Sequence, residues 1–254
     1  MFALASSSVS AHGPSPLRMH DTALEFGALF FQAYATNKVN PRIVDVGACD
    51  VNGSLRSVAP NSLEYVGLDF DLGPGVDIVL EDPYRLPLED DTFDFCVSSS
   101  TLEHAEFFWL SFLEMMRIVR PNGLVYLNVP SNGEFHRHPK DCWRFYPDSG
   151  LALQNWACRN GFPSVLLESF IGRRRNDQWN DFVAVFLKDA SFISEYPNRI
   201  VDRTDHFTNG YRHGEAHRLR PAQYQEDQSV LTNAVSTFRR LVRPLRSAMR
   251  RNQG

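Results

Sequence analysis

Short apolar runs recur along the first three quarters of the chain, separated by longer segments of mixed polarity. Their length and nearly continuous apolar character are typical of buried parallel strands, which are covered on both faces. Five such runs are predicted as strands, at residues 42–47, 64–69, 76–80, 93–99 and 123–130.

The longer segments between the runs have helical periodicity. Residues 102–119 place apolar side chains at helical spacing and stop before Arg120-Pro121-Asn122-Gly123, a helix-ending and turn signal. Helices are also predicted near residues 22–36 and at 149–160, the latter ended by Gly161 and Pro163. Strand, helix and strand in repetition predict an α/β fold with a Rossmann-like, doubly wound sheet.

Two further apolar runs, at residues 164–170 and 181–187, are joined by only about ten polar residues. A parallel crossover needs about a dozen residues or more and usually a helix, so these two runs are predicted to form an antiparallel hairpin. The expected sheet is therefore mostly parallel with a C-terminal antiparallel hairpin strand. An ordinary dinucleotide-binding fold, in contrast, keeps its strands parallel.

The chain is expected to divide into three parts. Residues 1–40 form a Ser-, Ala-, Gly- and Pro-rich leader with a helix, residues 41–188 form the α/β domain, and residues 189–254 form a C-terminal extension. Apolar periodicity fades after Lys188, which predicts irregular structure to about residue 227. Residues 229–251 can form a basic amphipathic helix, which would either lie on an anionic membrane surface or dock on the domain with a solvated basic tail.

Composition narrows the class of protein. With 254 residues, 43% of them hydrophobic, the chain can bury a full core. Its net charge of −4 gives no drive toward nucleic acid, so a nucleic-acid partner is not expected. The four cysteines lack CxxC spacing, and the chain has neither a signal-peptide pattern nor a long apolar stretch, so we expect a cytoplasmic protein.

A glycine-containing loop from Asp45 to Gly53 follows the first predicted strand. Gly47 lets the backbone turn sharply and approach a ligand, and Asp45 can either hold this loop by hydrogen bonds or face a ligand ammonium group. The spacing is neither GxGxxG nor GxxxxGK[ST], so the loop lacks the phosphate-binding fingerprints of dinucleotide and ATP sites.

Carboxylates also end the next two predicted strands. Asp69, 22 residues after Gly47, is placed to accept hydrogen bonds from ribose hydroxyls, whereas Asp71 and Asp77 are competing carboxylates or solvated loop charges. Asp82 can accept from an adenine amino group, and Tyr84 can offer a ring face. The coincidence of suitable groups at three strand ends indicates a nucleoside-containing ligand.

These pieces resemble the class I S-adenosylmethionine-dependent methyltransferases, in particular the type 11 group of small-molecule enzymes. The resemblance spans roughly residues 41–188 and is carried by VDVGACDVNGS, YVGLDFD, LEDPYRLPLEDDTFDFCVSSSTLEH and MMRIVRPNGLVYLNVPS. It implies the class I methyltransferase fold and S-adenosyl-L-methionine as cofactor. One departure from the family pattern is Cys49, which stands where the first motif usually has its second glycine.

The resemblance also implies a set of cofactor-binding residues. Asp45, Gly47 and the adjoining Ala48 form the first motif, Asp69 and Asp82 follow on the next strands, and Ser99 and Ser100 lie near the methionine end. The side chain of Cys49 narrows the loop, and residues 50–53 can compensate by shifting the turn.

The candidate catalytic residues lie beyond the fourth and fifth predicted strands, where ligands bind in such sheets. They are His104 and, within the segment HRHPKDCWRFYPD, His136, His138 and Asp141. A base is needed for a poorly acidic hydroxyl acceptor, and histidines with a carboxylate and aromatic rings suit a sugar or another polyhydroxylated molecule. The sequence of this segment also resembles, more loosely, those of methyltransferases of polysaccharide and glycolipid biosynthesis.

Structural alternatives exist for the same residues. Trp143 and Phe145 can pack beneath the loop while Asp141 and Arg144 form an ion pair, and His104 can be a structural hydrogen-bonding residue. His136, His138 and Asp141 can instead hold a divalent metal. Of these possibilities, a metal ion is not expected in the site.

The leading hypothesis is an O-methyltransferase for a small polyhydroxylated or glycosyl acceptor, including a polysaccharide or glycolipid precursor. A second hypothesis is C- or N-methylation of an aromatic or lipid molecule. A third, from another class, is a non-catalytic binding module that keeps the fold and docks through its basic C-terminal helix.

Overall fold

The fold is described from a computed structural model, in which residues 21–36, 38–51, 53–176, 178–223 and 226 are described. The predicted leader at residues 1–20 and the predicted basic helix at 229–251 lie outside the described residues. Peripheral membrane contact through that helix therefore stays a prediction. No helix in the described part of the chain is long and apolar enough to cross a membrane.

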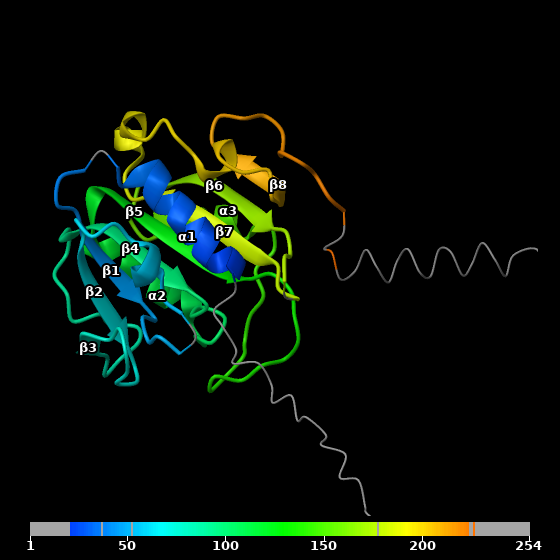
Figure 1. The fold of residues 1–254 in the computed structure, drawn as a ribbon. Helices are drawn as coiled ribbons and strands as arrows, with labels where there is room; N and C mark the ends of the chain where they lie inside the picture. Colours follow the sequence, from blue (N-terminus) through cyan, green and yellow to red (C-terminus); the bar gives the residue numbers. More distant parts are fainter. Residues whose placement is uncertain (1–20, 37, 52, 177, 224–225, 227–254) are drawn as a thin grey trace, which may run out of the picture.

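One eight-stranded sheet forms the centre of the molecule, in the order β3-β2-β1-β4-β5-β7-β6-β8 (Figure 1). Strands β1 to β5 are parallel, and β7 runs antiparallel to both β5 and β6. The predicted mostly parallel sheet with an antiparallel hairpin is confirmed. The strands are β1 (Arg42–Val46), β2 (Glu64–Asp69), β3 (Ile78–Val79), β4 (Phe93–Ser99), β5 (Val119–Pro130), β6 (Val165–Gly172), β7 (Asp181–Leu187) and β8 (Phe207–Arg212).

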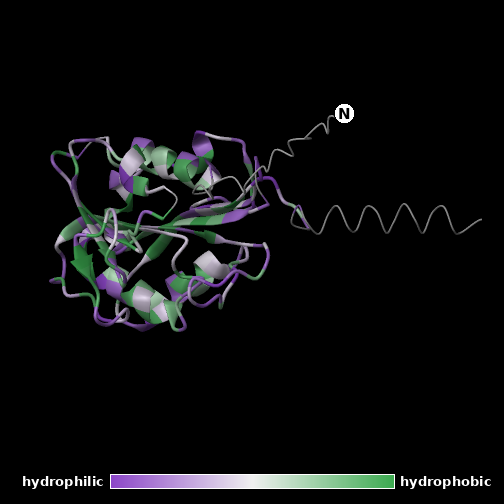
Figure 2. Cartoon of the chain, turned by 60° about the horizontal axis from the view of Figure 1, so that its bottom comes forward, coloured by the Kyte–Doolittle hydropathy of each residue, from purple (hydrophilic) through white to green (hydrophobic). Residues whose placement is uncertain are grey.

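Helices cover both faces of the sheet (Figures 1 and 2). Helix α1 (Asp21–Tyr34) packs on one face, and α2 (Phe108–Ile118) and α3 (Ser149–Arg159) pack on the other. Three short 3₁₀ helices complete the described elements: η1 (Leu55–Val58), η2 (Ala190–Glu195) and η3 (Ile200–Asp202).

Burial on both faces explains the nearly continuous apolar strands. Side chains alternate along a strand, so Val44 and Val46 of β1 join the core beneath α2 and α3, whereas Ile43 joins the core beneath α1. The core beneath α1 is rich in aromatic rings. The Phe30 ring lies 4.8 Å from that of Tyr126 and 5.7 Å from that of Phe95, measured between centroids.

Helix α2 is shorter than the predicted segment 102–119. Residues 101–105 instead form turns, in which the amide of His104 donates to Thr101 O and that of Ala105 to Leu102 O. The carbonyl of Glu103 accepts hydrogen bonds from the amides of Cys142 and Trp143. Tertiary hydrogen bonds thus occupy a carbonyl that a continuous helix would use, and they override the helical pattern.

Two strand boundaries also differ from the predictions. Strand β3 contains only Ile78 and Val79, because Gly73 to Val76 form a turn in which Gly75 has a φ of 87°. Strand β5 begins at Val119, and its pairing with β4 moves from Phe93↔Val119 to Phe95↔Leu124. The predicted turn at residues 120–123 is therefore an irregularity inside the strand, and it does not separate helix from strand.

The prediction of irregular structure after Lys188 was wrong over β8. This strand pairs antiparallel with β6, and only Phe207 and Gly210 within it are buried. Its large apolar side chains are few, Phe207 and the half-buried Tyr211, and the polar residues and Gly210 between them leave only a weak period-two signal in the sequence. The sheet thus extends past residue 188, and the predicted three-part division of the chain stays a prediction.

Truncating Phe30 to alanine should test the aromatic core. The Phe30 side chain is fully buried, so Phe30→Ala should lower the free energy of unfolding by about 3–5 kcal/mol. Val39 is 91% exposed, and Val39→Ala, the control, should change it by less than about 0.5 kcal/mol. Urea unfolding monitored by circular dichroism measures both, and equal effects of the two substitutions would contradict this description of the core.

Candidate cofactor and acceptor site

The strand order reverses between β1 and β4, which are neighbours at the centre of the sheet. Connections leave these two strands in opposite directions, which is where open α/β sheets bind ligands. The segments that follow the carboxyl ends of β1, β4 and β5 therefore meet at one edge of the sheet. They carry most of the residues predicted for the site.

Gly47 makes the turn after β1, with a φ of 89°. Its amide and that of Ala48 donate to Leu68 O of β2, at 2.8 and 3.0 Å. A Cβ at Gly47 would lie 1.9 Å from Oγ1 of Thr101, the second residue after β4. Glycine is therefore required both by the backbone conformation and by the close approach of Thr101.

Asp69 joins the turn after β1 to the end of β2. Its Oδ2 accepts from the amide of Cys49 at 2.9 Å, and its Oδ1 accepts from the amide of Phe70 at 2.7 Å. Cys49, the departure from the family pattern, directs its Sγ toward Gly73, where a Cβ would lie 2.6 Å from that sulfur. Asp69 is only half-buried, and an ionised carboxylate accepts about four hydrogen bonds, so capacity remains for a ligand.

Asp45 is buried and accepts from the Tyr65 hydroxyl at 2.6 Å. Burial raises the pKa of Asp45 from its ordinary 3.8 to about 7, and the hydrogen bond from Tyr65 opposes this rise. The guanidinium of Arg56 lies over the Tyr65 ring and pairs with Asp77. Asp77 also accepts from the amide of Gly67 at 2.8 Å, so this exposed carboxylate supports the loop while remaining in contact with solvent.

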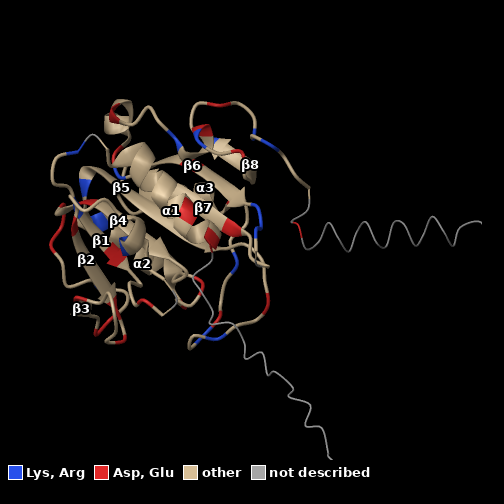
Figure 3. Cartoon of the chain, in the orientation of Figure 1, with Lys and Arg blue, Asp and Glu red and all other residues tan. Residues whose placement is uncertain are grey.

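Asp82 follows β3 and is exposed. Its Oδ1 accepts from the amide of Tyr84, and the Tyr84 hydroxyl accepts from the amide of Phe107. The rings of Tyr84 and Phe107 lie 5.4 Å apart between centroids. Acidic residues gather along the loops around β2 and β3 (Figure 3), which makes this side of the edge negative.

Ser99 and Ser100 end β4. The Oγ of Ser99 is buried and has no hydrogen-bond partner in the structure. Ser100 is exposed with a φ of 52°, and its amide donates to Asn128 O at 2.9 Å. A buried hydroxyl without a partner costs free energy, which favours a polar ligand group at this strand end.

The predicted catalytic histidines converge from two loops. The rings of His104 and His136 lie 5.1 Å apart between centroids, and that of His138 lies 6.3 Å from His104. Glu103, which the sequence did not single out, is 1% exposed, and its Oε1 lies 3.6 Å from Nε2 of His104. Burial raises the pKa of Glu103 from 4.5 to about 8.

Asp141 has a positioning role in this structure. Its two oxygens contact the Arg144 guanidinium at 2.5 and 2.9 Å, and Oδ2 also accepts from the amide of His136 at 2.7 Å. The hydrogen bonds from Arg144 lower the pKa of Asp141 to about 2. The alternative in which Asp141 and Arg144 form an ion pair thus holds in the structure, and Asp141 fixes the His136 backbone.

The packing of Trp143 and Phe145 that the same structural alternative predicted is also present. Phe145 is buried and stacks on Phe182 at 6.1 Å between centroids. Trp143 is 36% exposed, packs against Phe108, and donates from Nε1 to Ala105 O. Both rings therefore fasten the 131–148 segment to the domain.

Metal-compatible geometry occurs at a different trio from the predicted one. In the described residues, the group of side chains that could hold an ion is Glu103, His104 and His136, whose ligand atoms lie within 4.8 Å of one another. The trio proposed from sequence used His138 and Asp141 instead of Glu103 and His104. Asp141 is occupied by Arg144, so its alternative role as a metal ligand is not favoured.

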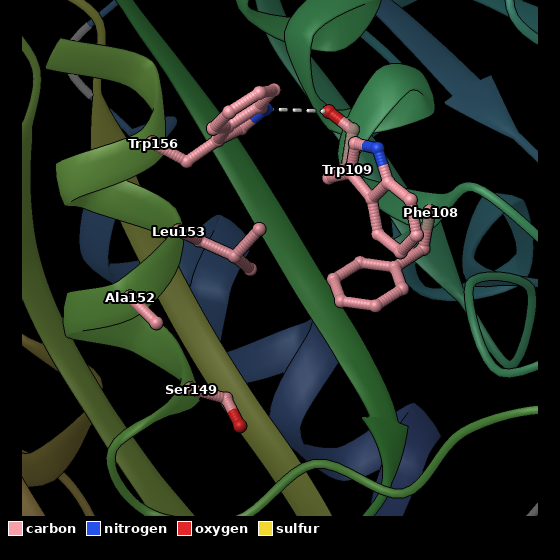
Figure 4. Close-up of a pocket in the computed structure, with 6 residues that line it drawn as sticks. All are labelled: Phe108, Trp109, Ser149, Ala152, Leu153 and Trp156. Carbon is pink, nitrogen blue, oxygen red and sulfur yellow. Dashed lines mark hydrogen bonds between the residues drawn. The ribbon is translucent and has the colours of Figure 1, made fainter. Parts of the chain in front are cut away.

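An apolar hollow opens between α2 and α3, lined by Phe108, Trp109, Ser149, Ala152, Leu153 and Trp156 (Figure 4). The Nε1 of Trp156 donates to Trp109 O across it at 3.1 Å. The hollow lies between the helices on one face of the sheet, and the predicted site residues do not line it.

The raised pKa of Asp45 predicts a pH-dependent stability. The unfolded chain ionises this group near its ordinary pKa, while the folded protein resists ionisation up to about pH 7. Stability provided by the protonated form is therefore lost as the pH rises through this interval. Asp45→Asn cannot ionise and keeps an acceptor for Tyr65. The free energy of unfolding of this variant, relative to that of the wild type, should therefore increase by about 1–4 kcal/mol between about pH 5 and about pH 8. Urea titrations at both pH values measure this gain, and a difference that does not change with pH would argue against it.

Residues 27–127, from α1 to β5, match the family model described as a methyltransferase domain. An uncharacterised methyltransferase of Mycobacterium ulcerans is 29% identical over 168 residues, which cover 59% of this chain and 65% of that protein. One of Mycobacterium bovis is 31% identical over 119 residues, which cover 42% of this chain and 46% of that protein. The chain thus spans between about half and two thirds of the length of these relatives.

Similarity to solved structures agrees with the sheet topology. A crystal structure of 1,6-didemethyltoxoflavin-N1-methyltransferase from Burkholderia thailandensis, with bound 1,6-didemethyltoxoflavin and S-adenosylhomocysteine, has a TM-score of 0.52 and 14% identity. The similarity covers 66% of this chain and 79% of that one, and at this identity it supports the fold alone. Residues 27–127 are thus similar to a methyltransferase domain, and the fold of the chain is similar to that of a methyltransferase of known structure.

Proposed function

We propose that the protein transfers a methyl group from S-adenosylmethionine to a hydroxyl of a small polyhydroxylated or glycosyl acceptor. The main support for cofactor binding is the hydrogen bond between Cys49 and Asp69, which joins the Gly47 turn to a half-buried carboxylate. Asp69 would accept from the ribose hydroxyls and Asp82 from the adenine amino group. Gly47 and Ala48 would allow close approach of the ligand, and Asp45, Ser99 and Ser100 would lie near its methionine part.

The residues present suit such a ligand chemically. The unpartnered Oγ of Ser99 needs a polar group, and the ionised form of Asp45 would attract an ammonium group. When bound, S-adenosylmethionine supplies a methyl group on a positively charged sulfur, and on transfer to the acceptor oxygen the carbon–sulfur bonding pair stays on sulfur. The chain's own residues then have to align the acceptor and help its hydroxyl lose a proton.

The preference for a hydroxyl acceptor rests on the group Glu103, His104 and His136. These polar side chains lie on loops that leave the same edge of the sheet as the cofactor residues, with His138 nearby on the same loop as His136. Imidazole nitrogens within hydrogen-bonding reach of a hydroxyl can promote its deprotonation. Asp141 would contribute indirectly, by holding His136 in place.

Replacing Asp69 should weaken cofactor binding. Asp69→Ala removes the acceptor for the ribose hydroxyls and should lower the affinity for S-adenosylhomocysteine by about tenfold to hundredfold. Asp69→Asn, which keeps one acceptor oxygen, should lose less. Titration calorimetry measures the affinities, with the exposed neighbour Asp71 changed to alanine as the matched control. Absence of binding by the wild-type chain, or binding indifferent to Asp69→Ala, would refute the proposed cofactor site.

The acceptor can be sought through the mass of the product. Cells that lack this protein should accumulate a metabolite or glycan lighter than its normal form by one methylene, detectable by untargeted mass spectrometry. With that acceptor in hand, His104→Ala and His136→Ala should each lower kcat by about 10²–10⁴-fold, the usual range for loss of acid–base assistance. The exposed residue His217, which is not among the predicted site residues, is changed to alanine as the control. Full turnover by both site variants would contradict the role given to these histidines.

A further inference from the structure

The group Glu103, His104 and His136 has the features of a metal site. The three residues come from two segments, one after β4 and one after β5, and each offers a ligand atom within 4.8 Å of the others. Two imidazoles and one carboxylate are the ligand set of many three-ligand catalytic zinc sites, which leave a position open.

His104 is oriented as a metal ligand would be. Its Nδ1 contacts the carbonyl of Lys140, and because a carbonyl can only accept, Nδ1 carries the proton. Nε2 is then the unprotonated nitrogen, and it lies on the side of Glu103, at 3.6 Å from Oε1. A hydrogen bond from the second nitrogen to a backbone carbonyl is the usual way in which proteins orient a metal-binding histidine.

Glu103 supplies the independent indication of a missing partner. Its side chain is 1% exposed, and Oε2 is buried without a hydrogen-bond partner. A buried carboxylate oxygen that is left unpaired carries a large desolvation cost. A cation between Oε2, Oε1 and the histidine nitrogens would remove that cost.

His136 is held in place from several sides. Its backbone amide donates to Asp141, whose carboxylate is fixed by Arg144, and its ring lies 4.8 Å from that of Trp179 between centroids. Trp179 in turn packs so closely on Gly133 that a Cβ there would lie 1.8 Å from the indole. The histidine is therefore preorganised beside its two partners.

Hydrogen bonds and an ion pair also join the two segments that carry His104 and His136. Glu103 O accepts from the amides of Cys142 and Trp143, and Lys140 pairs with Glu106 at 2.6 Å. These contacts fix the distance between His104 and His136 through the backbone. Little rearrangement is then needed to bring the ligand atoms to the roughly 3.4 Å separation of a tetrahedral site with bonds of about 2.1 Å.

We propose that Glu103, His104 and His136 bind one divalent transition-metal ion, of the zinc class, at the acceptor side of the site. The imidazoles favour such an ion over Mg²⁺, which prefers oxygen ligands. The nearby charge permits it, because Asp141 neutralises Arg144, and Glu103, which would release its proton on binding the ion, would supply one negative charge to the cation. Its chemical role rests on the proposed function. With both imidazoles engaged as ligands, the ion would replace them in promoting deprotonation: it would polarise an acceptor hydroxyl, whose proton passes to bulk water while the oxygen takes the methyl group.

Zinc binding by the metal-stripped full chain tests this site. Titration calorimetry with Zn²⁺ should give one site per chain with micromolar or tighter affinity, and Mg²⁺ should not compete. His136→Ala, His104→Ala and Glu103→Gln should each weaken binding by about tenfold or more. His217→Ala, which removes an exposed histidine elsewhere, should leave it unchanged. No saturable binding, or equal binding by the wild type and the site variants, would overturn the proposal.

Two further measurements test whether the ion binds at a cysteine instead and whether the site variants lose their fold. Substitution by Co²⁺ should give the visible absorption of a four- or five-coordinate site without a thiolate charge-transfer band. Such a band, removed by Cys142→Ser, would assign the ion to that exposed cysteine and overturn the proposal. Thermal unfolding of His136→Ala, whose side chain is 36% exposed in the native protein, should match wild type in the absence of metal.

Binding of S-adenosylhomocysteine, measured on the same samples, separates the two proposals. A chain that binds S-adenosylhomocysteine but not Zn²⁺ refutes the metal site alone. A chain that binds Zn²⁺ but not S-adenosylhomocysteine refutes the proposed function and leaves the metal site in place.

Discussion

The parallel pairing of β2, β1 and β4 is the constraint on which the rest of the molecule depends. Parallel neighbours bring their carboxyl ends to one edge, so a turn after one strand can bond to the end of the next. Gly47 and Ala48 bond to Leu68 in this way, and Cys49 bonds to Asp69. Gly47, Ala48 and Asp69, which we propose contact the cofactor, are thus part of the hydrogen bonding that holds the sheet edge together.

The same edge carries a second set of contacts between segments. The residues after β4 and those after β5 are joined by Glu103 O with two amides, by Trp143 with Ala105 O, and by the His104 ring with Lys140 O. These contacts place polar side chains from distant parts of the sequence in one group. A shape-specific acceptor site requires such rigidity, because small displacements of catalytic groups are costly.

Much of the fold could be predicted from the sequence, because buried parallel strands and helix-covered faces leave strong apolar patterns. Strands β2, β4 and β7 begin and end where those patterns do. The start of α2 and the presence of β8 could not be predicted, since tertiary hydrogen bonds decide the first and pairing with β6 decides the second. At the site, motif spacing indicated the aspartates and histidines. The burial of Glu103, the unpartnered Ser99 and the pairing of Asp141 with Arg144 depend on contacts between loops, which spacing does not encode.

The two ends of the described sheet differ from its centre in a way that affects association between molecules. One end is β3, which has only two residues, and the other is β8, whose half-buried positions include Thr208, Asn209 and Arg212. An outermost strand offers unpaired backbone groups to other chains, and proteins counter this with very short or polar outer strands. Both ends of this sheet follow that rule. The long apolar strands lie in the middle of the sheet, where their backbone groups are already paired and cannot form hydrogen bonds with a strand of another molecule.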